Sequence, residues 1–212
     1  MTIRGAVFGL LTAVLCSLAL AGGAVAADVI YTPTGRAADG VVADVYFGSH
    51  DAGIVKLAAG LGGFELNLSN YRTPGLDLSR LVRDDATVYG FSCQLLPETP
   101  VTPSLCIGAK DMTNKLREGT TFFGVVGKEL TFLDRSGFFS RIYASAGFGS
   151  CTLKKAFGSV SLEIKDRVYV DGEMYNGGSS WGAGIRFNDM FRAGYLRFDG
   201  RDYGGIRFAL EF

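Results

Sequence analysis

Alternation of apolar and polar residues is the feature that most constrains the fold of this chain. After residue 27 the sequence repeats a run of about eight to ten residues in which every second side chain is apolar, and each run is followed by a turn. Successive side chains of a strand point to opposite faces of a sheet, so each run predicts a strand with one apolar and one polar face. Twelve such runs are present: 41–49, 53–61, 64–72, 87–96, 104–111, 121–129, 138–147, 157–164, 168–174, 181–187, 191–198 and 203–212.

The length and number of these runs favour a barrel whose apolar face meets lipid. Strands of about nine residues, tilted by roughly 40°, span the ~25 Å apolar band of an outer membrane, and bacterial barrels have an even number of strands. We therefore predict an all-β, antiparallel, up-and-down transmembrane β-barrel of about twelve strands. Ten strands remain possible, because residues 97–103 are long for a periplasmic turn and residues 50–52 are short for an outer loop.

The last run carries a second indication of the same fold. Its apolar residues share one face, and the chain ends on phenylalanine. A terminal Phe that closes an alternating strand resembles the C-terminal signal read by the outer-membrane barrel assembly machinery. A soluble β-sandwich that ends in Phe is the alternative. The candidate assembly signal consists of Ile206, Phe208, Leu210 and Phe212.

The first 27 residues predict a secretory signal peptide. Arg4 provides the positive start, residues 6–21 are apolar and uncharged, and residues 24–26 form an A-x-A cleavage site. The apolar stretch is short for a membrane-spanning helix. We expect cleavage near Ala26 or Ala27, one barrel domain over residues 28–212, and a location in the outer membrane of a Gram-negative bacterium.

The polar faces of the runs carry charges of both signs, which the predicted barrel places inside. These side chains either pair and fill a narrow interior or line a polar path, and both interpretations stay open. Glycines on the same faces, such as Gly108, Gly184 and Gly205, favour open space. The run 121–129 is apolar on both faces, which a β-bulge or packing against an internal plug would explain. The candidate lumen-lining residues are Asp44, Lys56, Glu65, Lys110, Arg141, Tyr169, Asp171, Glu173, Arg186 and Arg207.

Residue types needed for catalysis or metal binding are scarce. His50 is the only histidine and lies in a predicted turn, so a nucleophile would lack a base, and we expect no enzyme. The balance of 21 basic and 21 acidic residues argues against a nucleic-acid partner. Cys93, Cys106 and Cys151 follow the signal peptide without a Cys-x-x-Cys pair, so we expect neither a metal site nor a cofactor. Alternation places Cys93 and Cys106 on opposite faces, which disfavours a disulfide between them.

Several segments carry a family resemblance. One extends from Leu76-Asp77-Leu78 to residues 103–111, where a proline precedes a strand that ends in Gly-x-x-Asp. The others are residues 120–128, 146–149, 157–160 and 173–177, and together the segments cover roughly half of the mature chain. This pattern resembles the YjbH-like outer-membrane proteins, which are associated with exopolysaccharide secretion. Members of that family are several times longer and have Gly-Trp-Gly where this chain has Gly-Phe-Gly at 147–149. The resemblance implies a role near polysaccharide export and marks Asp111 and Glu173 as matched polar positions.

Two functions are consistent with these features. The leading hypothesis is a passive, porin-like or accessory barrel in the export of exopolysaccharide or another polar solute. The alternative is a structural or adhesive barrel with a filled lumen, which acts through extracellular loops with exposed residues such as Arg72, Leu81, Arg83, Leu116 and Arg117. The expected partners are outer-membrane lipid, the barrel assembly machinery and, in the first case, polysaccharide.

Overall fold

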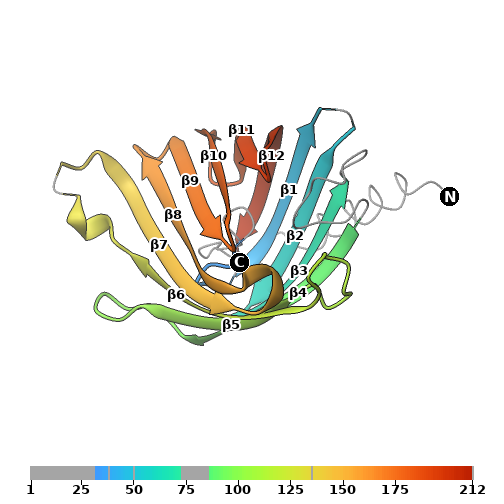
Figure 1. Ribbon diagram of the computed structural model, residues 1–212. Coiled ribbons are helices and arrows are strands. Elements are labelled where there is room, and N and C mark those ends of the chain that lie inside the picture. The colour runs from blue at the N-terminus through green and yellow to red at the C-terminus, as the bar shows by residue number, and fades with distance from the viewer. Residues whose placement is uncertain (1–31, 38, 50, 73–85, 135, 212) are drawn as a thin grey trace.

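The protein is a closed barrel of antiparallel strands (Figure 1). The computed structural model describes residues 32–37, 39–49, 51–72, 86–134 and 136–211, so the expected signal peptide, its cleavage site, Leu81, Arg83 and Phe212 lie outside the described residues. The strands are β1 (Gly40–Gly48), β2 (Gly53–Leu61), β3 (Phe64–Arg72), β4 (Ala86–Leu96), β5 (Ser104–Lys110), β6 (Thr121–Glu129), β7 (Phe139–Gly149), β8 (Lys155–Ile164), β9 (Val168–Tyr175), β10 (Gly178–Arg186), β11 (Phe191–Phe198) and β12 (Arg201–Glu211).

The order of the strands confirms the predicted fold class. Each strand pairs with its neighbours in sequence, and β1 pairs with β12 to close the sheet. The barrel is therefore up-and-down and antiparallel with twelve strands, and the ten-strand alternative is wrong. Two short 3₁₀-helices, η1 (Thr131–Leu133) and η2 (Cys151–Leu153), lie in connections between strands. No helix in the described part of the chain is long and apolar enough to cross a membrane.

Strands β10 and β12 begin three and two residues earlier than the alternation predicts, because the turns before them are tight. Asn176-Gly177 joins β9 to β10, and Asp199-Gly200 joins β11 to β12. All four residues have positive φ angles, between 20° and 79°, which two-residue hairpin turns of the Asn-Gly and Asp-Gly type require. Such turns bring the two strands together at once, so pairing continues to the turn itself.

The connections define two ends of the barrel, which we name after the two ends of β1. The Gly40 end holds the connections 62–63, 97–103, 130–138, 165–167 and 187–190. The other connections meet at the Gly48 end, among them residues 111–120 and 150–154. Alternate connections share an end because the strands run up and down in sequence order.

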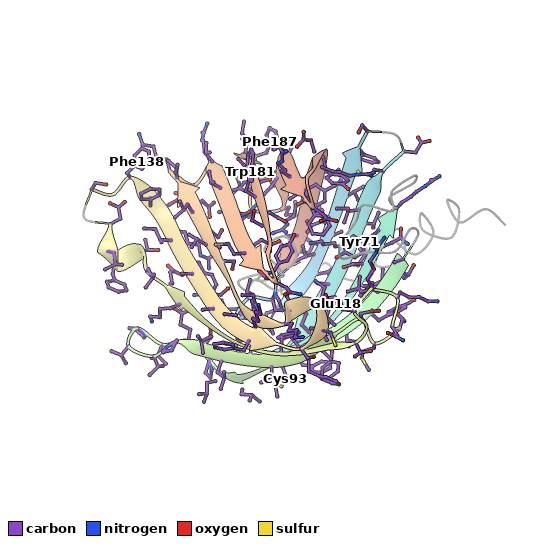
Figure 2. The ribbon with its side chains drawn as sticks, viewed as in Figure 1. Tyr71, Cys93, Glu118, Phe138, Trp181 and Phe187 are labelled. Carbon is purple, nitrogen blue, oxygen red and sulfur yellow. The ribbon has the colours of Figure 1, made fainter. Side chains whose placement is uncertain are left out.

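The outer face of the barrel is apolar along the middle of the strands. Large apolar side chains are exposed there on separate strands, for example Leu66 (57% exposed), Val160 (45%) and Ile206 (52%). Several exposed aromatic side chains lie at or next to strand ends, among them Phe64, Phe148 and Phe187 (Figure 2), whereas Trp181 and Tyr195 lie nearer the middle of their strands. The charged side chains of the outward-facing positions lie within two residues of a strand end: Arg72, Lys128, Arg197 and Asp202.

Candidate functional site: the barrel interior

An apolar cluster fills the interior toward the Gly48 end. Its side chains come from strands all around the barrel, and the rings of Tyr71 and Phe198 stack with centroids 6.0 Å apart. We call it the Gly48-end cluster; its larger members are Ile54, Tyr71, Val88, Leu116, Phe123, Val125, Leu153, Phe157, Tyr175, Leu196, Phe198 and Tyr203.

The cluster explains why strand β6 is apolar on both faces. Phe123 and Val125 point inward and are 8% and 1% exposed, whereas Phe122 and Val126 point outward. The pairing of β6 with β5 and with β7 proceeds one residue at a time, so the strand contains no bulge. Of the two predicted explanations, packing against an internal filling is therefore the correct one.

Loops at the Gly48 end contribute to this filling. Asp111, with a φ of 58°, accepts hydrogen bonds from the backbone N–H groups of Lys115 (2.7 Å) and Leu116 (2.6 Å) and from the hydroxyl of Thr113 (3.0 Å). This turn directs Leu116 inward, where it is fully buried. The expectation that Leu116 is an exposed loop residue is wrong, because the Asp111 carboxylate folds the loop back into the barrel.

Aromatic rings occupy the space next to the interior glycines. Gly108 is directly opposite Phe123, and Gly205 is directly opposite Tyr46. A Cβ atom on Gly108 would lie 2.5 Å from the Phe123 ring, and one on Gly205 would lie 2.3 Å from the Tyr46 ring. The interpretation of these glycines as open space is therefore wrong: a neighbouring strand fills each gap with a ring.

The chain that precedes β1 also lies inside the barrel. Residues 32–37, called here the N-terminal segment, include Thr32 (fully buried), Thr34 and Ala37. The backbone N–H and the hydroxyl of Thr32 both donate to Oε2 of Glu173 on β9, at 2.8 and 2.9 Å. A Cβ atom on Gly35 would lie 2.3 Å from the backbone nitrogen of Gly127 on β6, so the two backbones touch because neither residue has a side chain. The segment thus contacts the inner face of two strands that are three positions apart in the barrel, β6 and β9.

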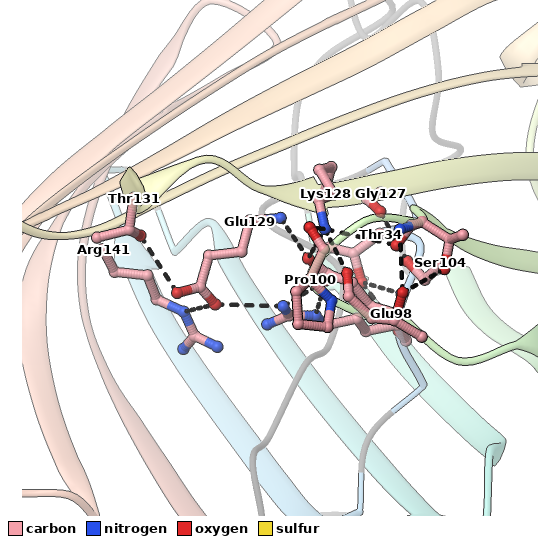
Figure 3. A network of polar contacts seen from close by, with 12 residues as sticks. Thr34, Glu98, Pro100, Ser104, Gly127, Lys128, Glu129, Thr131 and Arg141 are labelled. Atoms are coloured by element: carbon pink, nitrogen blue, oxygen red, sulfur yellow. Dashed lines mark hydrogen bonds and ion pairs between the residues drawn. The ribbon is translucent and has the colours of Figure 1, made fainter. Parts of the chain in front are cut away.

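Charged residues anchor the N-terminal segment at the Gly40 end (Figure 3). Nε of Arg36 donates to Oε2 of Glu98 at 2.9 Å, and Nη2 of Arg36 pairs with Glu129 at 3.2 Å. Oε1 of Glu98 accepts the backbone N–H of Glu129 at 2.7 Å, and Glu129 in turn lies 3.5 Å from Arg141. Lys128 pairs with Glu98 at 3.4 Å. The connection 97–103 and strands β6 and β7 are tied to the segment through this network.

The electrostatics of Glu98 favour the ionised form. Partial burial alone would raise the pKa of this carboxyl group, but the Glu129 N–H and the Arg36 guanidinium outweigh burial and hold the pKa below its usual range. The anchor is therefore charged at neutral pH.

The structure places the ten candidate lumen-lining residues inside the barrel. Arg207 donates to both carboxylate oxygens of Asp44, at 2.6 and 2.8 Å, across the seam between β12 and β1. Arg186 pairs with Glu163 and with Asp189. The remaining candidates also face the interior. Glu173 accepts hydrogen bonds from Thr32, Asp171 accepts one from Ser161 (2.6 Å), and Arg141 pairs with Glu129. Tyr169 packs over Gly184 and Gly194, and Lys56, Glu65 and Lys110 line small cavities.

Two cavities lie between these polar residues, and both are small. One is lined by Arg36, Glu65 and Lys110, the other by Asp44, Lys56 and Glu65. Each has room for only about one or two water molecules. They fit hydration of the buried charges and not a bound solute.

In the described part of the chain, the cysteines form no disulfide and the cysteines and acidic residues form no metal cluster. Cys93, Cys106 and Cys151 are free thiols. Cys93 points outward (Figure 2) whereas Cys106 is buried, so the two lie on opposite faces of the sheet, as the alternation predicts. Within the described residues no group of three or more His, Cys, Asp or Glu side chains is placed to hold a metal ion.

The sequence does not predict the N-terminal segment. Residues 32–37 do not alternate and belong to none of the predicted strands. A weak signal was present: Gly35 and Arg36 lie between the apolar leader and the first strand, where a plain linker needs neither a small residue nor a charge.

Neither a comparison with models of protein families nor a comparison with curated proteins gives a match for this chain.

Proposed function

We propose that this protein is an integral outer-membrane barrel of a Gram-negative bacterium. The observation that carries the proposal is the outer face. Among the described residues it is apolar in the middle of the strands, has aromatic side chains at several strand ends, and is charged only within two residues of an end. Closure of the sheet leaves no unpaired strand edge, which hydrocarbon would penalise. The apolar outward positions of β12, Ile206, Phe208 and Leu210, support recognition by the barrel assembly machinery.

The membrane proposal is tested by moving a charge along the outer face. Val160→Arg places a cation in the middle of β8 and should destabilise the inserted barrel by about 2–4 kcal/mol, whereas Phe47→Arg near the Gly48 end should cost about 0–1 kcal/mol. Insertion is measured as membrane-fraction protein that resists SDS until it is boiled. Equal effects of the two substitutions, or a wild-type protein that folds without lipid or detergent, would refute the proposal.

Within the membrane we propose a closed structural or adhesive barrel. The Gly48-end cluster and the N-terminal segment occupy the interior, which supports the filled-lumen hypothesis over an open porin. The surface that such a barrel offers is its Gly48 end, where the connection from Arg72 to Ala86 is the longest; outer loops are generally the longer ones. We likewise propose no enzymatic role.

A gated passage for exopolysaccharide or another polar solute is the second candidate. The N-terminal segment favours it, because polar contacts hold the segment and can be exchanged for contacts with water. The resemblance to the YjbH-like family supports the same substrate but stays a prediction.

Planar-bilayer recording separates the two candidates. Wild-type barrels should be silent in both cases. A Thr32→Val/Arg36→Gln variant weakens the contacts of the N-terminal segment with Glu173 and with Glu98. This variant should stay silent if the protein is a closed structural barrel, and it should give conductance steps if the segment gates a passage. Asp189→Asn serves as the control, since this carboxylate is 94% exposed at the same end. Steady conductance of the wild type would overturn the proposal of a closed structural barrel.

A further inference from the structure

Three arginines form a row on the inner face of neighbouring strands. Arg186 on β10 is directly opposite Arg192 on β11, and Arg192 is directly opposite Arg207 on β12. We call these residues the arginine row. Like charges placed directly opposite each other on one face of a sheet are destabilising. A barrel that keeps three of them in register therefore needs a compensating anion near the row.

Each of the two outer arginines has a carboxylate in direct contact, whereas the middle one has no direct ion-pair partner among the described residues. Arg186 pairs with Glu163, and Arg207 pairs with Asp44. Within the described residues Arg192 makes no ion pair; its guanidinium lies 5.6 Å from the centre of the Tyr169 ring. Glu163 and Asp171 attract Arg192 only at longer range. Their hydrogen bonds go elsewhere: Glu163 accepts from Arg186, and Asp171 accepts from Ser161.

A second unused donor lies next to Arg192. The hydroxyl of Tyr169 packs over two glycines: a Cβ atom on Gly184 would lie 2.5 Å from it, and one on Gly194 would lie 2.4 Å from it. Within the described residues this hydroxyl makes no hydrogen bond. A guanidinium and a hydroxyl that both lack an acceptor at one place are the donors that carboxylates and phosphates bind.

We propose that the arginine row binds an anionic group, a carboxylate or a phosphate, with Arg192 and the Tyr169 hydroxyl as its donors. Arg192 is the second residue of β11 and partly exposed, so the ligand enters from the Gly40 end. The site needs no open channel and is therefore independent of whether the barrel conducts.

Titration calorimetry on the refolded, detergent-solubilised barrel tests the site. The probes are inorganic phosphate and trigalacturonate, with maltotriose as a neutral control. We expect saturable binding of at least one anion, weakening with added NaCl, and no binding of maltotriose. Arg192→Gln should lower the affinity by about tenfold or more. Arg197→Gln, which removes an outward-facing arginine of the same strand, should leave it unchanged.

Each outcome of the calorimetry either supports or overturns the proposed anion site. Binding of phosphate alone or of trigalacturonate alone supports the site and identifies the anion. Wild-type protein that binds neither anion, Arg192→Gln that binds like wild type, or equal binding of maltotriose overturns the proposal. Resistance to SDS before boiling shows that each variant is folded. Should Arg192→Gln fail to fold, Tyr169→Phe must weaken binding for the proposal to stand.

Discussion

The ion pair at the barrel seam predicts a large loss of stability on removal of one charge. Asp44 and Arg207 join the first and last strands, and their side chains are only 3% and 19% exposed. Asp44→Asn keeps the shape of the side chain but leaves the Arg207 guanidinium without its carboxylate. Loss of one partner of a buried pair costs about 3–5 kcal/mol. Because Arg207 keeps some contact with water, we expect the lower limit, about 3 kcal/mol.

Urea unfolding of the barrel in lipid vesicles measures this loss. Trp181 is the only tryptophan and reports on unfolding by fluorescence. The double variant Asp44→Asn/Arg207→Gln should be less unstable than the sum of the single variants, since neither charge is then left alone. Asp189→Asn should change the free energy of unfolding by less than about 1 kcal/mol. An Asp44→Asn barrel as stable as wild type, or strictly additive effects, would refute the reasoning.

Three further predictions concern the seam, the anchor and the cysteines. Gly205→Ala should destabilise the barrel by about 1–3 kcal/mol in the same urea assay, because its Cβ atom would lie 2.3 Å from the Tyr46 ring. Folding lowers the pKa of Glu98, so the ionised carboxylate contributes to the free energy of unfolding. This contribution is fully present at pH values above the pKa in the unfolded chain, and it is lost as the pH falls through the pKa in the folded protein. Hydrogen-exchange protection of residues 32–37 should therefore drop on acidification, and this drop should be absent in Glu98→Gln. Cys93 should react with a membrane-permeant maleimide in the folded barrel, whereas Cys106 should react only after unfolding; equal rates would contradict its burial.

The wall of the barrel could be predicted from the sequence because alternation is a local property. A strand with one apolar face shows this pattern whatever its neighbours are, and the twelve predicted runs match the twelve strands to within three residues at each end. The cleaved leader and the terminal Phe lie outside the described residues and stay predictions.

The filling of the interior could not be predicted because it depends on register. Gly108 and Phe123 are fifteen positions apart in sequence, and only the pairing of β5 with β6 sets them opposite each other. The partners of Thr32 and Arg36 are more distant still: Glu173 lies 141 residues from Thr32, and Glu98 lies 62 residues from Arg36. A non-alternating segment gives no indication of which walls it contacts.

The two fillings of the interior differ in how readily each could leave. To open the Gly48-end cluster would expose several large apolar side chains at about 1.5–3 kcal/mol each. The contacts of the N-terminal segment are mainly hydrogen bonds and ion pairs, which contribute about 0.5–3 kcal/mol each, because water replaces them on release. The N-terminal segment therefore leaves first. Its departure opens a cavity from the Gly40 end that the Gly48-end cluster still closes at the far side. If Arg192 binds an anion as proposed, a blind, charged cavity of this kind would act as a binding chamber and not as a pore.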